Sequence, residues 1–202
     1  MTSLPNPASE TELAGWWSEV NRLDLAVYAA IAATPTPTLD RAFRRLSHAA
    51  DYSKLWLASA TLLATTGGAG GRRAAVNGLA ATGLTSAVVN LVLKPLGRRR
   101  RPDRELYRVP VARQVEMPKS TSFPSGHSAS AFAFATGVAS VSPAAGIPLS
   151  ALAALVAYSR VHTGVHYPGD AVVGSVTGGA LAPLAVGALE RCREASRNRA
   201  GP

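Results

Sequence analysis

The sequence predicts an all-α fold, a membrane-embedded bundle of about five to six helices. Hydrophobic residues make up 47% of the 202 residues and charged residues only 16%. The apolar stretches are rich in Ala, Gly, Ser and Thr, the small residues through which membrane helices pack against one another. No segment alternates between apolar and polar residues as a strand would. The length is that of one domain, with an N-terminal region (1–50), a core (51–190) and a basic tail (191–202).

The N-terminal region predicts a disordered tip and two helices outside the core. Residues 1–9 are polar and contain prolines. From 10 to 33, apolar residues recur at helical spacing, and Trp16 and Trp17 suit the headgroup level of a bilayer. An interfacial amphipathic helix and an ordinary helix packed on the protein fit this pattern equally well. Two prolines end it, and residues 39–48 predict a short basic helix.

The core contains five apolar stretches, each a predicted helix: 52–66, 74–93, 128–141, 144–158 and 170–189. Two of them have about the length needed to cross a bilayer. The others are shorter, so a soluble bundle with Ala-rich core helices is the alternative. The first twenty residues carry three glutamates instead of a basic start followed by an apolar run. We therefore expect insertion through internal helices and no signal peptide.

Charge and cysteine content exclude several classes of protein. Lys and Arg number 21 against 12 Asp and Glu, and the net charge is +9. With so few charged residues overall, this excess predicts basic loops between membrane helices, and no nucleic-acid partner is expected. The lone Cys192 excludes an internal disulfide and a Cys-based metal site.

The first of three polar clusters has the form K-x6-RP and follows the 74–93 stretch. Lys94 stands at the expected end of that helix, and Arg101 is followed by Pro102, which favours an extended backbone. A lysine point charge and a forked guanidinium together match a tetrahedral phosphate. Lys94 alone would more often be a snorkelling helix end. Residues 98–100 are interpreted as a basic juxtamembrane run.

The second cluster is Pro124-Ser125-Gly126-His127, immediately before the 128–141 stretch. Backbone N–H groups at a helix start, with a glycine that permits close approach, form an anion site without a metal. The Ser125 hydroxyl adds a donor. His127, at the edge of such a pocket, could protonate a departing oxygen. Read alone, Ser-Gly-His is more often a helix cap.

The third cluster, SR-x5-H-x3-D, joins the last two stretches. Ser159-Arg160 ends one helix, His166 lies in the loop, and Asp170 begins the final helix. Asp170 can accept one ring N–H of His166 and leave the other nitrogen free to attack phosphorus. Arg160 would be a third cation on the phosphate. His162 is off this pattern and is not expected to touch substrate, and His48 is expected at the surface.

The order and spacing of the three clusters resemble the signature of the type 2 phosphatidic acid phosphatase superfamily, in its membrane lipid phosphatase branch. The match spans residues 94–170 and departs from the family pattern at none of the key positions. The resemblance implies that five residues bind phosphate: Lys94, Arg101, Ser125, Gly126 and Arg160. It further implies that His166 is the nucleophile, that Asp170 orients it and that His127 is the general acid. Catalysis would need no metal and no other cofactor.

These residues indicate a phosphatase acting on a lipid phosphate or diphosphate through a phosphohistidine. Candidate substrates are a polyprenyl phosphate or diphosphate, a polyprenyl phosphosugar, phosphatidic acid and phosphatidylglycerol phosphate. One alternative is a vanadium haloperoxidase, because vanadate occupies the same kind of anion pocket. Another is a non-enzymatic basic membrane protein that binds anionic lipid, which explains the arginines but not the spacing of the histidines.

We expect an integral protein of a bacterial cell membrane, with membrane lipids around it and the capacity to form a homo-oligomer. If every apolar stretch crosses once, the N-terminal region and the two cluster-bearing loops share one face. That face then carries 15 of the 21 Lys and Arg residues. The positive-inside rule then favours a cytoplasmic position for it and for the predicted active site. The alternative is an outward-facing site, the arrangement that many bacterial lipid phosphatases of the family resemble.

Overall fold

The computed structural model describes residues 7–199, with side chains from Gly15 onward, and the regular secondary structure of this part of the chain is helical, with no strand. Two helices precede the bundle, α1 (Pro7–Ala33) and α2 (Pro37–Ala49). The bundle itself consists of α3 (Lys54–Thr66), α4 (Gly68–Val88), α6 (Gly126–Ala139), α7 (Pro143–His162) and α8 (Pro168–Arg199). Short elements connect them: η1 (Asp51–Ser53), the π-helical η2 (Val89–Leu93), α5 (Lys94–Gly97) and η3 (Val111–Arg113). The predicted all-α class is confirmed.

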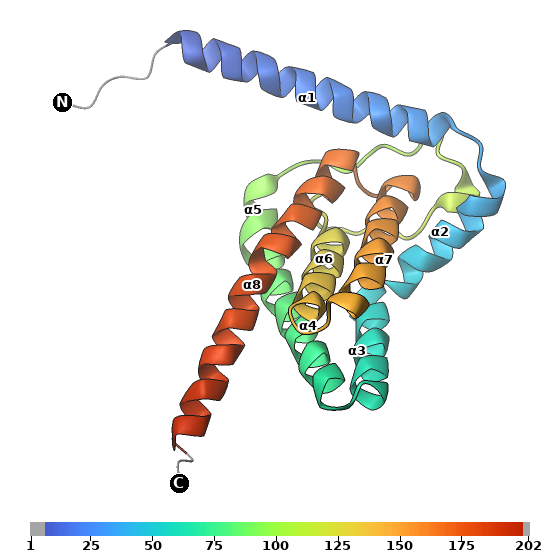
Figure 1. Cartoon of the computed structure of the whole chain (residues 1–202). Coiled ribbons are helices and arrows are strands. Elements are labelled where there is room, and N and C mark those ends of the chain that lie inside the picture. The colour runs from blue at the N-terminus through green and yellow to red at the C-terminus, as the bar shows by residue number, and fades with distance from the viewer. Residues whose placement is uncertain (1–6, 200–202) are drawn as a thin grey trace.

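Helix α6 forms the centre of the bundle, surrounded by α4, α7 and α8 (Figure 1). Its alanines at 129, 131, 133 and 135 are completely buried together with Phe134. Small residues let the neighbouring backbones come very close. A Cβ placed on Gly178 of α8 would lie 2.0 Å from the carbonyl oxygen of Ala129. The predicted packing through small residues is therefore observed directly.

Three segments are long and apolar enough to cross a bilayer: Gly68–Gly97, Pro143–His162 and Pro168–Arg199. Helices α3 and α6 have only 13 and 14 residues, which is about 20 Å at the rise of an α-helix against a hydrocarbon core of about 30 Å. The bundle therefore combines three long helices with two short ones, one of which is buried at its centre.

Several helices are longer than the apolar stretches that predicted them. The segment predicted to end before Lys94 continues through η2 and α5 to Gly97, and α7 continues past Arg160 to His162. Helix α8 extends to Arg199, so residues 191–199 are helical. Backbone hydrogen bonds continue a helix through polar residues once an apolar face has docked, and the apolar pattern marks only that face. Helix α1 begins at Pro7, within the segment 1–9 expected to be a disordered tip, and residues 1–6 lie outside the described part.

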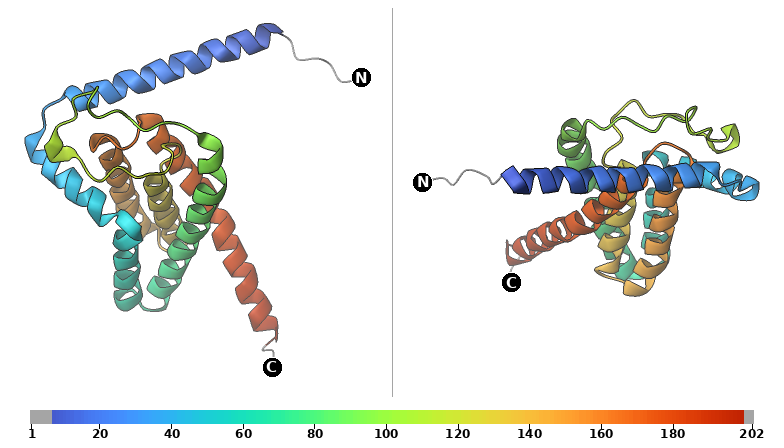
Figure 2. Two further views of the ribbon diagram at one scale, coloured as in Figure 1. Left: turned by 180° about the vertical axis from the view of Figure 1, so that it is seen from behind. Right: turned by 90° about the horizontal axis from the view of Figure 1, so that it is seen from above.

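Helix α1 crosses one end of the bundle, the end at which the 98–125 loop and the α7–α8 loop also lie (Figure 2). The turns at 66–68 and 140–142 lie at the opposite end (Figure 1). The three regions predicted to share a face thus do so.

A buried polar network fastens the α1–α2 corner to the bundle. Arg113 is completely buried, and its Nε donates to Asp40 Oδ1 over 2.7 Å while its other nitrogens reach carbonyl oxygens of Ile31 and Thr34. His162 Nε2 lies 3.0 Å from the same carboxylate oxygen. One carboxylate therefore ties α2 to both the long loop and α7.

Candidate active site

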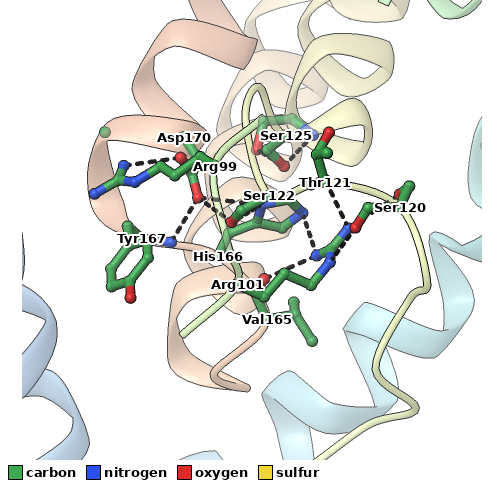
Figure 3. Close-up of polar contacts among 12 residues, drawn as sticks. Arg99, Arg101, Ser120, Thr121, Ser122, Ser125, Val165, His166, Tyr167 and Asp170 are labelled. Atoms are coloured by element: carbon green, nitrogen blue, oxygen red, sulfur yellow. Dashed lines mark hydrogen bonds and ion pairs between the residues drawn. The ribbon is translucent and has the colours of Figure 1, made fainter. Parts of the chain in front are cut away.

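The three sequence clusters converge at the α1 end of the bundle (Figure 3). Arg101 connects two of them, because its NH1 donates to the carbonyl oxygen of Val165 over 2.8 Å and lies 3.2 Å from His166 Nε2. Its remaining donors reach Ser120 and Thr121. The loop thereby presents a guanidinium directly beside one ring nitrogen of His166.

The other ring nitrogen of His166 faces Asp170. His166 Nδ1 lies 3.5 Å from Asp170 Oδ2, and the same carboxylate oxygen accepts hydrogen bonds from the Ser122 hydroxyl and the Tyr167 N–H. Asp170 is completely buried. Held this way, the imidazole keeps Nδ1 toward the carboxylate and Nε2 toward the cation, which is the orientation predicted for a nucleophile.

Electrostatics keep His166 neutral. Burial lowers the pKa of His166 to about 4, the nearby Arg101 and Arg160 lower it further, and only Asp170 opposes them. A neutral imidazole has a free lone pair, so the ring is ready to act as a nucleophile over the whole physiological range.

The Pro-Ser-Gly-His turn begins α6, as predicted, but its donors are partly used. Ser125 is the N-cap, and its Oγ accepts from the Ser128 hydroxyl over 2.9 Å. Its backbone N–H is bound to the carbonyl oxygen of Asp170 at 3.0 Å. The anion site therefore has the N–H groups of Gly126 and His127, which open the first turn of the helix, together with the proton of the Ser125 hydroxyl.

Lys94 and Arg160 approach this turn from two other helices. Lys94 Nζ lies 3.5 Å from where a Cβ on Gly126 would be, and it donates to Asn90 Oδ1 over 3.0 Å. Arg160 is 2% exposed, and its NH1 donates to the Ser47 hydroxyl. Its Nε has no hydrogen-bond partner among the described residues. Buried donors without partners are costly, so a ligand with several acceptor oxygens fits this position.

His127 lines a cavity of ≈ 340 Å³. Its Nε2 lies 2.9 Å from Asp51 Oδ1, and Asp51 in turn lies 3.8 Å from Arg160 NH1. His48 and Glu116 line the same cavity. All eight predicted site residues thus belong to one connected region, and no predicted site residue is left outside it.

The interpretation of residues 98–100 as a basic juxtamembrane run does not account for Arg99, which forms two ion pairs within the protein. Its NH1 donates to Asp170 Oδ1 over 2.9 Å and its NH2 to Asp24 Oδ2 over 2.7 Å, with the guanidinium 4.1 Å from the Tyr167 ring centroid. Arg98 and Arg100 are exposed, as predicted. Three consecutive arginines differ in role only through the direction in which the loop turns them, which the sequence does not show.

Other polar residues at the site were also missed. Asp51 and Asp24 lie far from the clusters in sequence, and Ser120 and Ser122 are two of many serines. Nothing in the spacing distinguishes them. His162 faces Asp40 and not the site, and His48 is exposed, in agreement with the predictions for both.

Comparisons with known proteins decide the family. The profile of the PAP2 superfamily matches residues 74–194, which include every residue of the three clusters. The chain belongs to the PAP2 superfamily. A decaprenylphosphoryl-5-phosphoribose phosphatase from Mycobacterium tuberculosis is 33% identical over 179 residues, covering 86% of this chain and 96% of the relative. One from Mycolicibacterium smegmatis is 38% identical over 151 residues, covering 74% and 78%.

Two solved structures have the same fold. Aquifex aeolicus LpxE gives a TM-score of 0.67 at 24% identity, covering 81% of this chain and 94% of that one. The transmembrane PAP2 type phosphatidylglycerolphosphate phosphatase from Bacillus subtilis gives 0.62 at 27% identity, covering 86% and 87%. The predicted enzyme class, a phosphatase, is confirmed, and this PAP2 protein is an integral membrane protein. The soluble-bundle alternative is thereby set aside.

Proposed function

We propose that this PAP2 phosphatase removes the terminal phosphate of a polyprenyl phosphosugar, without a metal and through a phosphohistidine on His166. The observation that carries the mechanism is the position of His166, with Nε2 3.2 Å from Arg101 and Nδ1 3.5 Å from Asp170. The substrate class rests on the relatives named for a decaprenylphosphoryl phosphoribose, which match almost along their whole length.

Each group in the site has a chemical task. Lys94, Arg101 and Arg160 neutralise the phosphate, and the N–H groups of Gly126 and His127 bind its oxygens. His166 Nε2 attacks phosphorus, the P–O bond to the sugar breaks, and the leaving oxygen takes a proton from His127. In the second step neutral His127 takes a proton from water, the water oxygen attacks phosphorus, and the P–N bond breaks. Inorganic phosphate leaves and both histidines return to their starting states.

A second cavity suggests how a lipid-linked group reaches the phosphate site. It measures ≈ 190 Å³ and is lined by Lys94, Gly126 and His127 on one side and by Trp56, Ser86 and Asn90 of α3, α4 and η2 on the other. Next to Asn90, the side chain of Leu91 is 77% exposed on the surface that would face lipid. A headgroup in this cavity would keep its prenyl chain beside α4, outside the protein.

The test is phosphate release by purified protein in detergent with EDTA present. The panel contains a polyprenyl phosphoribose 5-phosphate, a polyprenyl diphosphate, phosphatidic acid and phosphatidylglycerol phosphate. We expect the phosphosugar to be the best substrate and His166→Ala to abolish turnover. Activity that survives in His166→Ala would refute the nucleophile. A preference for another member of the panel would refute the substrate class alone.

Each alternative function predicts a different experimental result. A vanadium haloperoxidase would oxidise bromide when vanadate is added. A non-enzymatic lipid-binding protein would bind anionic vesicles in a salt-sensitive way and release no phosphate. For this site we expect vanadate to inhibit phosphate release competitively, because it would occupy the position of the substrate phosphate.

The orientation in the membrane follows from charge. Fifteen of the 21 Lys and Arg residues belong to segments at the α1 end, so the positive-inside rule favours a cytoplasmic active site. Val111 is 80% exposed in the long loop, and Val111→Cys in a Cys192→Ser background provides a labelling site there. Labelling of intact cells by a membrane-impermeant thiol reagent would refute the cytoplasmic orientation.

A further inference from the structure

Asp51 is the acidic residue in direct contact with the predicted general acid, and it belongs to none of the three sequence clusters. Its Oδ1 lies 2.9 Å from His127 Nε2, and its Oδ2 lies 3.4 Å from His48 Nδ1. The same carboxylate lies 3.8 Å from Arg160 NH1. The hydrogen bond from His127 lowers the pKa of the Asp51 carboxyl, and Arg160 and His48 act in the same direction. Asp51 is therefore a carboxylate at working pH.

The backbone around Asp51 is bent in an unfavourable way. Tyr52 and Ser53 have φ values of 55° and 59°, the left-handed region in which a residue other than glycine is strained by about 1 kcal/mol or more. The Tyr52 side chain is 88% exposed, so its own packing does not explain the turn. This strained turn immediately follows Asp51, whose carboxylate lies on His127.

The segment before Asp51 supports the same placement. Ala50 is buried, and one turn earlier in α2 the Ser47 hydroxyl accepts a hydrogen bond from Arg160. Nearer the start of α2, the Asp40 carboxylate contacts Arg113 and His162. The segment from α2 to η1 therefore brings two acceptors, Ser47 and Asp51, onto residues of the second and third clusters.

We propose that Asp51 is a positioning residue that holds His127 as a protonated acid aimed at the leaving oxygen. The proposal rests on the function proposed above and adds a residue that acts through His127. With one ring nitrogen bound to Asp51, the other carries the proton that passes to the oxygen as the P–O bond breaks. Burial lowers the pKa of His127, and the charges of Arg160 and Lys94 lower it further, whereas the hydrogen bond to Asp51 and the charge of Asp51 raise it. Asp51 is therefore the group beside the ring that favours its charged form.

The proposed role predicts a dependence on the leaving group. A strongly basic leaving oxygen needs a proton as it departs, whereas a weakly basic one leaves with little help. Phenyl phosphate and p-nitrophenyl phosphate have nearly the same size, but phenolate is much the stronger base. Loss of a merely structural residue would slow the hydrolysis of both substrates equally. A change in the ratio of the two rates therefore reports on the general acid.

The experiment compares Asp51→Asn with wild type and with Glu116→Gln in detergent. Glu116 lines the same cavity, and its replacement removes a negative charge from that wall while leaving Asp51 on His127. For Asp51→Asn we expect kcat/KM to fall about 10- to 100-fold with phenyl phosphate and the lipid substrate, but less than about threefold with p-nitrophenyl phosphate, since general acids contribute about 10²- to 10⁴-fold. The basic limb of the pH profile should move to lower pH. Glu116→Gln should leave the ratio unchanged.

A second readout does not depend on activity. Diethyl pyrocarbonate modifies neutral imidazoles, and mass spectrometry distinguishes the peptides that carry the four histidines. Modification of His127 should begin at lower pH in Asp51→Asn than in wild type. If Asp51→Asn does not yield a monodisperse protein, Asp51→Glu takes its place; it keeps the charge but moves it, and the rate ratio should change in the same direction by a smaller factor.

Each outcome separates the two proposals. If wild-type protein releases no phosphate from any substrate, the proposed function fails, and the labelling shift alone then decides the contact between Asp51 and His127. If wild type is active and Asp51→Asn slows both aryl substrates equally, the role of Asp51 is refuted while the phosphatase stands. A lower KM with an unchanged ratio would also refute it, because Asp51 would then be an anion that competes with phosphate for Arg160.

Discussion

Arg99 offers the sharpest test of how the fold supports the proposed nucleophile His166 and its partner Asp170. It is placed between two carboxylates, Asp170 at 2.9 Å and Asp24 at 2.7 Å, and Asp24 also accepts the N–H of Gly169 at the start of α8. The contacts form a continuous path from α1 through Arg99 to the residue that orients His166. We predict that Arg99→Gln damages both stability and turnover.

The expected loss of stability depends on the hydrogen bonds that Asp170 and Asp24 keep when Arg99 is replaced. Removing one partner of a buried ion pair typically costs about 3–5 kcal/mol. Asp170 keeps the Ser122 hydroxyl and the Tyr167 N–H, and Asp24 keeps the Gly169 N–H, so the lower end applies. Loss of the stacking on Tyr167 adds about 0.5–1 kcal/mol. A total of about 3.5–4 kcal/mol would lower the melting temperature by roughly 7–16 °C for a chain of this length.

The assay measures thermal unfolding and phosphate release in the same detergent, with Arg100→Gln as the matched control. Arg100 is the exposed neighbour and its replacement removes the same charge. Because Arg99 acts through Asp170 and does not touch substrate, we expect kcat to fall about 10- to 100-fold while KM changes little. Asp24→Asn, which leaves Asp170 paired, should have a smaller effect of about 1 kcal/mol. If Arg99→Gln is as stable and active as Arg100→Gln, the supporting role is wrong.

Three further predictions concern protonation and packing. Because burial lowers the pKa of His166 from 6.5 to about 4, kcat/KM should show no acid limb near pH 6.5 from this residue, and any loss should come only near pH 4. The unfolded chain takes up that proton near pH 6.5 and the folded protein only near pH 4, so His166 does not affect stability above pH 6.5 and lowers it as the pH falls from 6.5 toward 4. Melting temperatures of wild type and His166→Asn, which lacks this slope, test the sign. Asp40→Ala leaves the buried Arg113 charge without its carboxylate and should lower the free energy of unfolding by about 3 kcal/mol, which thermal unfolding would show as a lower melting temperature. An unchanged melting temperature would mean that the carbonyl oxygens of Ile31 and Thr34 are enough to stabilise the Arg113 charge. Gly178→Ala places a Cβ 2.0 Å from a carbonyl oxygen of α6, whereas at Gly179 the nearest atom is 4.0 Å away, so only the first should destabilise, by about 1–3 kcal/mol, and equal melting temperatures would contradict the close packing.

Much of the site could be predicted because its residues lie within short, ordered clusters. Lys94, Arg101, His127, His166 and Asp170 each stand beside a turn residue or a helix end, and those positions survive any small error in helix boundaries. The apolar stretches likewise predicted the core helices, because burial against Ala and Gly demands small apolar residues at those positions.

What the sequence could not show is where separate segments meet. Asp51 reaches His127 across 76 residues, and Arg99 reaches Asp24 across 75. Such contacts depend on which way a loop turns a side chain and on how α1 and α2 lie over the bundle end. Neither leaves a periodic signal, because a single long-range contact repeats nowhere along the chain.

By itself, then, the amino-acid order determined the helical class and the membrane character and predicted the eight residues of the candidate phosphate site, since these follow from local patterns of apolar and polar side chains. Only the tertiary structure decided which carboxylate faces which cation. It set apart Arg99 from Arg98 and Arg100, turned His162 toward Asp40, and brought Asp51 to the general acid. The physical reason is that partner choice among charges depends on distance and burial in space, quantities that exist only once the helices have packed.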